Sequence, residues 1–251
     1  MKTKFKKKAK ILGWLIHEII HPFSVRKHTF LNSEETLKRL LSNPMPFCRW
    51  GDGESAIVSG SDIHFQSHDE ALAKELLECL ITAKSDLGFL LGAPRVVLEQ
   101  TSFGLLKNKK FKTWFKTNYL FKTIFKEPLT FGDAFLFRAY DNKMASLSLP
   151  RESLWDKVAL IVVGSDKGMM DAFEAQSQDK MIATITTPPK DAYQEIDEIE
   201  NKILDAYSQY HGGLPVRVLI AAGPTAKALV LRLYKQNIIS YDIGHYYKYN
   251  Q

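Results

Sequence analysis

The sequence is poor in cysteine, with two residues in 251, Cys48 and Cys79, whose spacing fits no metal-binding motif. A zinc–thiolate site is therefore excluded. Two thiols so far apart in the chain are typical of a reduced cytosolic protein in which at least one of them is buried. A disulfide between them is the alternative that the sequence leaves open. A chain of this length can bury a core without such a cross-link.

A long apolar run is missing at the N-terminus, where a targeting segment would lie. The apolar stretch 11–16 is far shorter than the roughly 20 residues of a membrane-spanning helix. His17 and Glu18 interrupt it and no small-residue cleavage site follows, which disfavours a signal peptide. Two interpretations remain for residues 1–30. They form either a basic amphipathic segment in loose contact with an anionic membrane, or a solvated tail that leads into a helix packed on the domain.

Outside this tail the positive and negative charges nearly balance. The net charge of +6 is matched by six lysines within the first ten residues, so the remainder is nearly neutral. A nucleic-acid-binding domain would carry its basic residues on a folded face, and no such pattern is present. The sequence therefore predicts no nucleic-acid partner. It favours a cytoplasmic protein, located at the inner face of the plasma membrane if the tail contacts lipid.

The common nucleotide fingerprints are absent as well. No G-x-G-x-x-G opens a helix after a strand, which disfavours a nicotinamide or flavin site, and no G-x-x-x-x-G-K-[ST] is present, which excludes a P-loop. What the chain does contain is a regular alternation of apolar runs and amphipathic stretches. Strands are expected at 46–50, 87–91, 158–163, 181–185, 216–222 and 238–243. This spacing predicts an α/β fold, a Rossmann-like open sheet of mostly parallel strands flanked by helices.

Local signals place several helix starts. Asn32 is expected to cap a helix that carries Glu35 at its third position and ends near residue 43. Ser67 is expected to cap a helix over 69–82. The stretch 103–125, rich in Lys, Phe and Trp, is interpreted as a helical pair that packs its aromatic residues inward. A surface for single-stranded nucleic acid is the alternative for that stretch.

Ligands of open parallel sheets bind beyond the carboxyl ends of the strands. The segments expected there are rich in glycine, hydroxyl groups and cations, which suit a diphosphate. They are 164–167, 186–190, 223–227 and 242–245. The turn at 223–227 either seats a phosphate on the N-terminus of a helix or merely starts that helix.

An acidic motif follows the first of these strands. The two glycines in the segment 51–54, Gly-Asp-Gly-Glu, predict a turn, because glycine permits backbone angles that other residues resist. Asp52 and Glu54 on such a turn can point the same way and share a hard divalent cation, which would neutralise a diphosphate leaving group. Arg49 just upstream either clamps the phosphates or pairs with one of the two carboxylates.

Residues 48–54, Cys-Arg-Trp-Gly-Asp-Gly-Glu, resemble the R-[FYW]-G-D-G-E signature of bacterial glycosyltransferases with the GT-D fold. Phe65 and Gln66, the segment 223–227 and the segment 242–245 resemble later landmarks of that family, in the same order. The resemblance implies a GT-D-like domain over residues 31–251. It also implies a D-x-E metal motif, Mn²⁺ or alternatively Mg²⁺ as the ion, and a UDP-sugar donor. The acceptor would be a glycan or glycoprotein of bacterial surface assembly.

The site expected from these observations has three parts. Asp52, Glu54 and His245 are assigned to catalysis, and Asp52 and Glu54 also to the metal. The donor diphosphate is assigned to Arg49, Gly51, Gly53, Arg138, Lys167, Gly223 and Thr225. The sequence departs from the family pattern around Arg138, where only that arginine and Tyr140 are kept, and at Lys167, which stands where an arginine is usual. A lysine supplies a point charge without the guanidinium fork, which bears on donor or acceptor specificity.

The function predicted from the sequence is the transfer of a hexose, glucose in the first instance, from a UDP-sugar to a glycan or glycoprotein. Two alternatives use the same residues differently. One is metal-dependent hydrolysis of a nucleotide or phosphoester by the same carboxylates. The other is a non-catalytic Rossmann-like module that docks on a membrane or a partner through its lysine tail. No residue in the sequence identifies itself as the general base that an inverting transfer would need.

Overall fold

A single sheet of eight strands organises the molecule. The computed structural model describes residues 27–107, 112–137, 151–177 and 180–244, together with Gly13 and Tyr246. Every registered strand pair is parallel. The order across the sheet is β1-β4-β3-β2-β8-β7-β5-β6. The strands are β1 (Thr29–Phe30), β2 (Phe47–Arg49), β3 (Leu90–Ala93), β4 (Thr130–Asp133), β5 (Ala159–Gly164), β6 (Met181–Thr186), β7 (Val216–Ala221) and β8 (Ser240–Asp242). The predicted α/β fold is confirmed.

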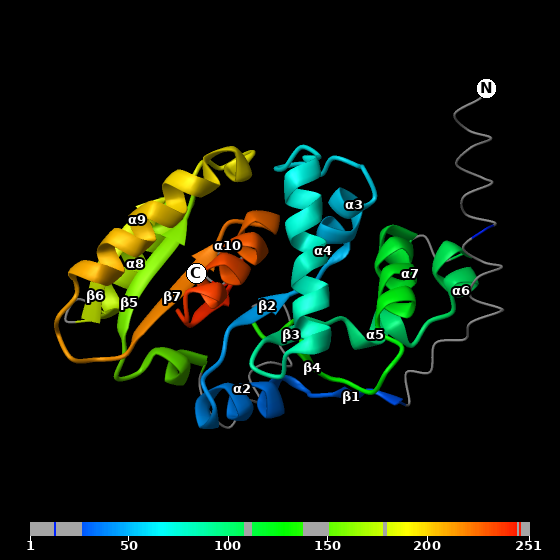
Figure 1. Ribbon diagram of the computed structural model, residues 1–251, viewed down its shortest axis with the longest axis horizontal. Helices are drawn as coiled ribbons and strands as arrows, with labels where there is room; N and C mark the ends of the chain where they lie inside the picture. The colour runs from blue at the N-terminus through cyan, green and yellow to red at the C-terminus, as the bar shows by residue number, and fades with distance from the viewer. Residues whose placement is uncertain are drawn as a thin grey trace.

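Helices cover both faces of the sheet. They are α2 (Ser33–Ser42), α3 (Asp52–Val58), α4 (Glu70–Ser85), α5 (Arg95–Leu98), α6 (Ser102–Lys107), α7 (Phe115–Ile124), α8 (Lys167–Ser177), α9 (Ile196–Gln209) and α10 (Pro224–Lys235), with short 3₁₀ turns at Lys112–Trp114, Arg151–Trp155 and Ala192–Glu195. Figure 1 shows α4 and α10 side by side in the middle of the molecule, with α9 towards one end and α7 towards the other. None of the described helices combines the length and the apolar character needed to cross a membrane.

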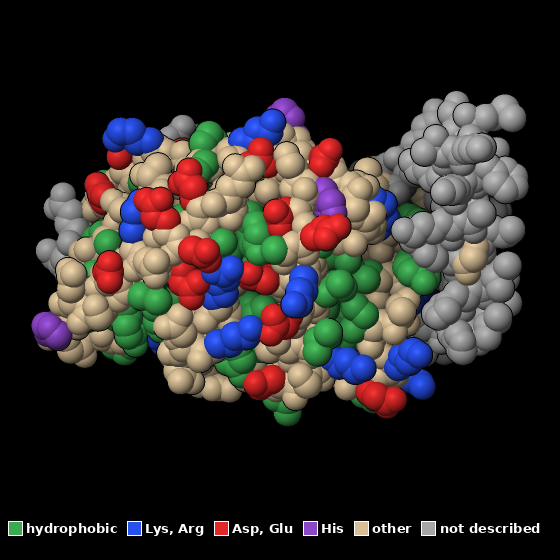
Figure 2. All heavy atoms as spheres, turned by 45° about the horizontal axis from the view of Figure 1, so that its top comes forward, with side chains coloured by type: hydrophobic (Ala, Val, Ile, Leu, Met, Phe, Trp, Pro, Cys, Tyr) green, Lys and Arg blue, Asp and Glu red, His purple; other side chains and the backbone are tan. Residues whose placement is uncertain are grey.

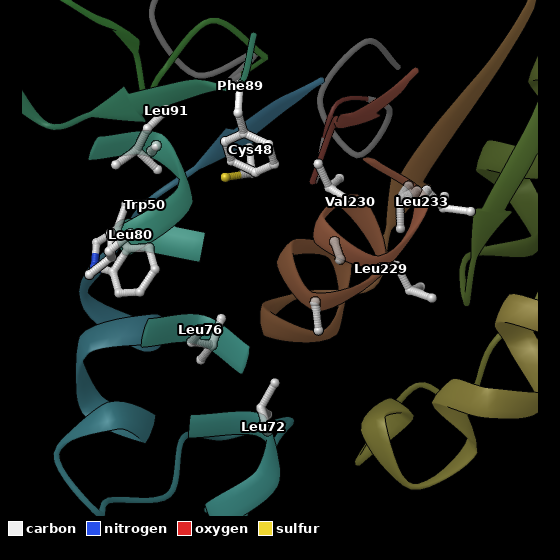
Figure 3. Packing of buried hydrophobic residues seen from close by; sticks show 14 of the residues in the cluster. Cys48, Trp50, Leu72, Leu76, Leu80, Phe89, Leu91, Leu229, Val230 and Leu233 are labelled. Carbon is white, nitrogen blue, oxygen red and sulfur yellow. The ribbon is translucent and has the colours of Figure 1, made fainter. Parts of the chain in front are cut away.

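Side chains alternate between the two faces along each strand, and so they feed two separate cores. Ile161 and Val163 of β5 pack with α4, α9 and α10, whereas Leu160 and Val162 of the same strand pack with α2 and α8. Figure 3 shows part of the first core, in which leucines of α4 and the apolar residues Leu229, Val230 and Leu233 of α10 lie around Cys48 and Phe89. This core holds α10 against the end of β2.

A group of ion pairs around Arg232 of α10 adds to this packing. Arg232 donates to Glu75 of α4 at 2.6 Å and to Asp197 and Glu200 of α9 at 2.6 and 2.9 Å. These ion pairs tie three helices together. Figure 2 shows that basic and acidic side chains of the described residues lie interspersed over the face it displays.

The predicted cap of α2 is confirmed in detail. The backbone N–H of Glu35 donates to the Asn32 side chain, and the N–H of Asn32 donates to the Glu35 carboxylate, both at 2.8 Å. The predicted cap of α4 is wrong. Asp69, and not Ser67, accepts from the N–H of Leu72 at 2.9 Å, and the Ser67 N–H instead donates to Asp191. The helix starts later because an aspartate directly before its first residue provides the better-placed acceptor.

The acidic motif is not a turn, as the sequence predicted, but the start of α3. Gly51 lies before the helix with φ −126°, Gly53 lies within it, and neither glycine uses the left-handed region. Gly51 is needed for space instead, because a Cβ there would come within 2.9 Å of the Glu54 carboxylate. The helix is anchored from behind, where Ser55 accepts from Trp50 Nε1 and from the Thr117 hydroxyl of α7, both at 2.8 Å.

Both cysteines are buried free thiols, as the sequence favoured. Burial raises the pKa of Cys79 well above its ordinary value, and the neighbouring Cys48 raises it further. The Cys79 thiol donates to the backbone carbonyl of Lys227 at 3.2 Å. The thiols are therefore packing residues beneath α10. In the stretch 103–125, α7 buries Phe115 and Phe121, which confirms the inward packing of its aromatic residues, whereas Phe111 lies outside the described residues.

Candidate functional site

The two halves of the chain meet where β2 lies beside β8. Phe47 pairs with Tyr241, and this register brings Arg49 beside Asp242 at the carboxyl ends of both strands. Arg49 Nε donates to the Asp242 carbonyl at 2.9 Å and Nη2 donates to its carboxylate at 3.1 Å. The guanidinium is therefore held by β8. The sequence had left open a pairing of Arg49 with Asp52 or Glu54, and the partner is Asp242.

Lys227 of α10 brings the later strands to the same point. Its ammonium lies 2.8 Å from Glu54 Oε1 and 3.0 Å from Asp242 Oδ2, and it donates to the Gly223 carbonyl at 3.1 Å. The exposed fractions of these side chains are 5% for Lys227, 9% for Glu54 and 0% for Asp242. Glu54 of the acidic motif and the glycine-containing turn after β7 thus lie close together, as the sequence predicted for the carboxyl ends of the strands.

Arg49, Glu54, Lys227 and Asp242 together form what we call the ion cluster, with two cations and two anions. Burial by itself raises the pKa of Asp242, but Arg49 and Lys227 outweigh it, so the pKa lies below the ordinary value. Burial likewise lowers the pKa of Lys227, but the charges of Asp242 and Glu54 outweigh it and the pKa is raised. Asp242 and Lys227 are therefore both charged around neutral pH.

A testable consequence is acid sensitivity. Because the folded-state pKa of Asp242 is depressed, its contribution to stability is complete above the unfolded value of about 3.9 and is lost as the pH falls through the folded value. Lys227 acts at alkaline pH. Because its folded-state pKa is raised, its contribution to stability is complete below the unfolded value of about 10.4 and is lost only as the pH rises above it. We expect the contribution of this cluster to the urea midpoint of unfolding to be independent of pH between these limits. Below about pH 4 the midpoint should fall. An acid limb that is unchanged in Asp242→Asn would contradict this assignment.

Glu54 is held on both carboxylate oxygens. Oε2 accepts from the Gly51 N–H at 2.8 Å and Oε1 faces Lys227. Asp52 differs, because its side chain is half-buried and makes no hydrogen bond or ion pair with any residue that the structure describes. A free carboxylate next to a buried charge cluster suits a hard divalent cation that takes its other ligands from phosphate oxygens. Asp52 therefore fits the predicted metal, and Glu54 fits it only where Lys227 releases an oxygen.

No group of three or more His, Cys, Asp or Glu side chains that could hold a metal ion occurs within the described ranges. Asp52 and Glu54 stand two positions apart on the first turn of α3, so the acidic motif offers at most two protein ligands. An Mg²⁺- or Mn²⁺-type ion in such a setting is usually completed by substrate phosphates. The donor set thus agrees with a metal shared between protein and substrate.

The turn after β7 forms another part of the candidate site. Gly223 has φ +55°, and a Cβ there would come within 2.6 Å of the Phe65 ring, so both backbone angle and space require glycine. Thr225 is fully buried and its hydroxyl donates to Gln66 Oε1 at 3.3 Å. Gln66 also approaches Asp191, whose N–H donates to the Phe65 carbonyl at 3.0 Å. The segment at 65–66 is therefore clamped against the start of α10.

The structure does not bring every predicted residue to this place. Lys167 starts α8, just after the carboxyl end of β5, and its side chain is 85% exposed and pairs with Asp171 of the same helix at 2.9 Å. Arg138 and His245 lie outside the described residues, so their roles stay predictions. Gly244, at φ +52°, is required by the cluster itself, since a Cβ there would run into the Arg49 guanidinium.

Lys227 is the functional residue that sequence reasoning missed. It was placed at the correct edge of the sheet but was given no role. The available signal was its position, because it is the sole charged residue of the stretch 224–231 and stands on a helix turn whose neighbours are all apolar, proline or threonine. A lone charge in a buried stretch implies a buried counter-charge.

Known proteins resemble this chain over most of its length. A family model described as "Glycosyltransferase GT-D fold" matches residues 47–250. The chain is similar to "Probable glycosyl transferase Gly" of Streptococcus gordonii, at 28% identity over 88% of this chain and 32% of that protein. It is also similar to "Glycosyltransferase GlyD" of Streptococcus pneumoniae serotype 4, at 24% identity over 84% of this chain and 26% of that protein. The chain thus spans about a third of the first relative and about a quarter of the second.

Solved structures show the same fold. A selenomethionine structure of the domain of unknown function 1792 superposes with a TM-score of 0.68 at 25% identity, covering 89% of this chain and 80% of that one. A structure entitled "A New Glycosyltransferase (DUF1792) from Streptococcus sanguinis" superposes with a TM-score of 0.64 at 24% identity, covering 88% and 82%.

Proposed function

Because the chain belongs to the family of glycosyltransferases with the GT-D fold, we propose that it transfers a hexose, glucose in the first instance, from a UDP-sugar to a glycan or glycoprotein acceptor. The observation that supports this most directly is the Asp52 carboxylate. It is half-buried, free of described partners, and set beside the ion cluster at the carboxyl edge of the sheet. Ligands of open α/β sheets bind at this edge.

The residues divide the work as follows. Asp52, with Glu54, would hold a divalent ion, Mn²⁺ in the first instance and Mg²⁺ as the alternative. Such an ion supplies electrostatic stabilisation of the negative charge that develops on a departing diphosphate. In the first turn of α10, Pro224 has no N–H and the Ala226 N–H donates to the Gly223 carbonyl, so the Thr225 N–H is the donor proposed for a phosphate oxygen. Arg49 acts through Asp242, which it holds in place beside Lys227.

Gly51, Gly53 and Thr225, which the sequence assigned to the donor diphosphate, stay proposed contacts of it, and each also has a role in packing. Gly51 leaves room for the Glu54 carboxylate. At Gly53, the Cβ of any other residue would lie 3.3 Å from the Ile63 side chain, so glycine lets α3 approach Ile63. Thr225 is engaged by Gln66, so it shapes the turn and contributes its backbone N–H. Contact of residues 1–30 with an anionic membrane stays a prediction, because all of that segment but Gly13 and 27–30 lies outside the described residues.

A nucleotide-sugar screen tests the proposal. A ligand that binds only the folded state raises its stability, by about 2.7 kcal/mol at a concentration of 100 times the dissociation constant. For a chain of this size that corresponds to roughly 2–4 °C in Tm for each kcal/mol. We expect UDP-sugars with Mn²⁺ to raise Tm by several degrees, and each component alone to raise it less.

Turnover then separates transfer from its alternatives. Release of UDP that depends on an added acceptor would support transfer. Equal release without acceptor would indicate hydrolysis of the nucleotide sugar. A UDP-sugar that neither stabilises the protein nor is turned over would contradict the proposal and favour a binding module.

A further inference from the structure

The Lys227 ammonium uses all of its hydrogen-bonding capacity inside the protein. An ammonium has three donors, and three acceptors surround this one: Glu54 Oε1, Asp242 Oδ2 and the Gly223 carbonyl, at 2.8, 3.0 and 3.1 Å. The side chain is 5% exposed. It thus occupies the space between a carboxylate of α3 and a carboxylate of β8, which is where an oxygen-ligated cation would lie.

The charge balance of the ion cluster disfavours the binding of a divalent ion to Glu54. The ion cluster is neutral, with Arg49 and Lys227 against Glu54 and Asp242. A divalent ion added to Glu54 would have to displace the ammonium or sit against it, and like charges at that distance repel strongly in a buried site. A diphosphate changes the balance, because it brings at least two negative charges and can attract an ammonium on a flexible four-carbon stem.

We propose that Lys227 is an internal counter-ion that keeps Glu54 away from divalent metal until a nucleoside diphosphate is bound. Without the diphosphate, only Asp52 of the acidic motif is open to a metal ion. With it, the ammonium is drawn towards the phosphates and Glu54 completes the metal site. Metal and donor therefore bind with positive coupling, and each raises the affinity for the other by the same factor. The diphosphate half of this inference rests on the proposed function, and the release of Glu54 in a Lys227 variant does not.

Binding of Mn²⁺ to the purified protein tests the proposal without any turnover. The fraction of free Mn²⁺ is measured by electron paramagnetic resonance, with and without UDP, for the wild type and for Lys227→Met. In the wild type we expect UDP to tighten Mn²⁺ binding by about tenfold or more. In Lys227→Met we expect Mn²⁺ alone to bind about tenfold more tightly than in the wild type, and UDP to add little. Lys227→Arg keeps the charge and is expected to behave like the wild type in the absence of UDP.

The double variant Lys227→Met with Glu54→Gln identifies the ligand that is released. It should lose the tightened Mn²⁺ binding, because the freed carboxylate is gone. Unchanged Mn²⁺ affinity in Lys227→Met, or a gain that survives Glu54→Gln, would overturn the proposal. If UDP fails to bind any variant while Lys227→Met still gains Mn²⁺ affinity through Glu54, the counter-ion role stands and the UDP-sugar donor is wrong.

A second comparison covers the case in which Lys227→Met does not fold. Glu54→Gln in the otherwise natural chain keeps an acceptor for the Gly51 N–H. It should leave Mn²⁺ affinity without UDP nearly unchanged, and should weaken it by about tenfold with UDP. Asp52→Asn should weaken Mn²⁺ binding under both conditions. Equal losses for Glu54→Gln with and without UDP would show that Glu54 is already open to the metal, and would overturn the proposal.

Discussion

Replacing Asp242 with alanine is expected to lower the free energy of unfolding by about 3–5 kcal/mol, the range found when one partner of a buried ion pair is removed. Asp242 is the one member of the ion cluster that contacts both cations, and its side chain is fully buried. Its loss removes the carboxylate that Arg49 contacts and leaves Lys227 with Glu54 alone, and the two cations are only 12% and 5% exposed. Desolvated cations without partners are costly because neither protein nor water compensates them.

Urea unfolding at neutral pH measures this effect, with the slope of the transition used to check that the denatured state is unchanged. Glu198→Ala is the matched control, since it also removes one carboxylate from an ion pair. Its partner Lys202 is 52% exposed and Glu198 itself 62%, so the loss should stay within about 1 kcal/mol. Equal effects of the two substitutions would mean that the cluster is solvated and that the burial of Asp242 has no energetic role.

Local signals in the sequence were sufficient for most of the framework. The continuous apolar run at β5 and the Asn32 and Glu35 capping pair act within a few residues, so each could be identified without knowing the fold. The strands β1 and β4 and the helix α3 were missed for a physical reason. Two and four residues carry too little periodicity, and two glycines within four residues argue for a turn when helix propensity alone is considered.

The candidate site shows where such reasoning ends. Asp52 and Glu54 are one residue apart, and the sequence predicted one role for both. The structure separates them, because Glu54 is held by Gly51 and Lys227, whereas Asp52 has no hydrogen bond or ion pair within the described part of the chain. That difference depends on a lysine 173 positions further along the chain, which only the packing of α10 against β2 brings near. Pairing among distant charges is set by tertiary structure, and no local pattern contains it.

Substitution of Asp52 by asparagine is expected to reduce UDP-sugar turnover by about 100-fold or more, with little change in stability. The size follows from the cost of removing one preorganised electrostatic contact to a developing charge. The stability should be kept because the Asp52 side chain makes no hydrogen bond or ion pair with a described residue, so its loss strands no buried partner. Initial rates of UDP release with acceptor present, together with Tm, measure both quantities on the same preparation.

Glu99→Gln serves as the control for this substitution, since it also neutralises a carboxylate at a helix end, the C-terminal cap of α5, which is 44% exposed and paired with Arg95. It should leave turnover and Tm unchanged. We thus expect Asp242, a member of the ion cluster, to be required for the fold, and Asp52, which is not a member, to be required for the chemistry. Asp52→Asn with wild-type turnover and an unchanged response to Mn²⁺ would remove the acidic motif from the mechanism, because the remaining carboxylate, Glu54, is already occupied by Lys227.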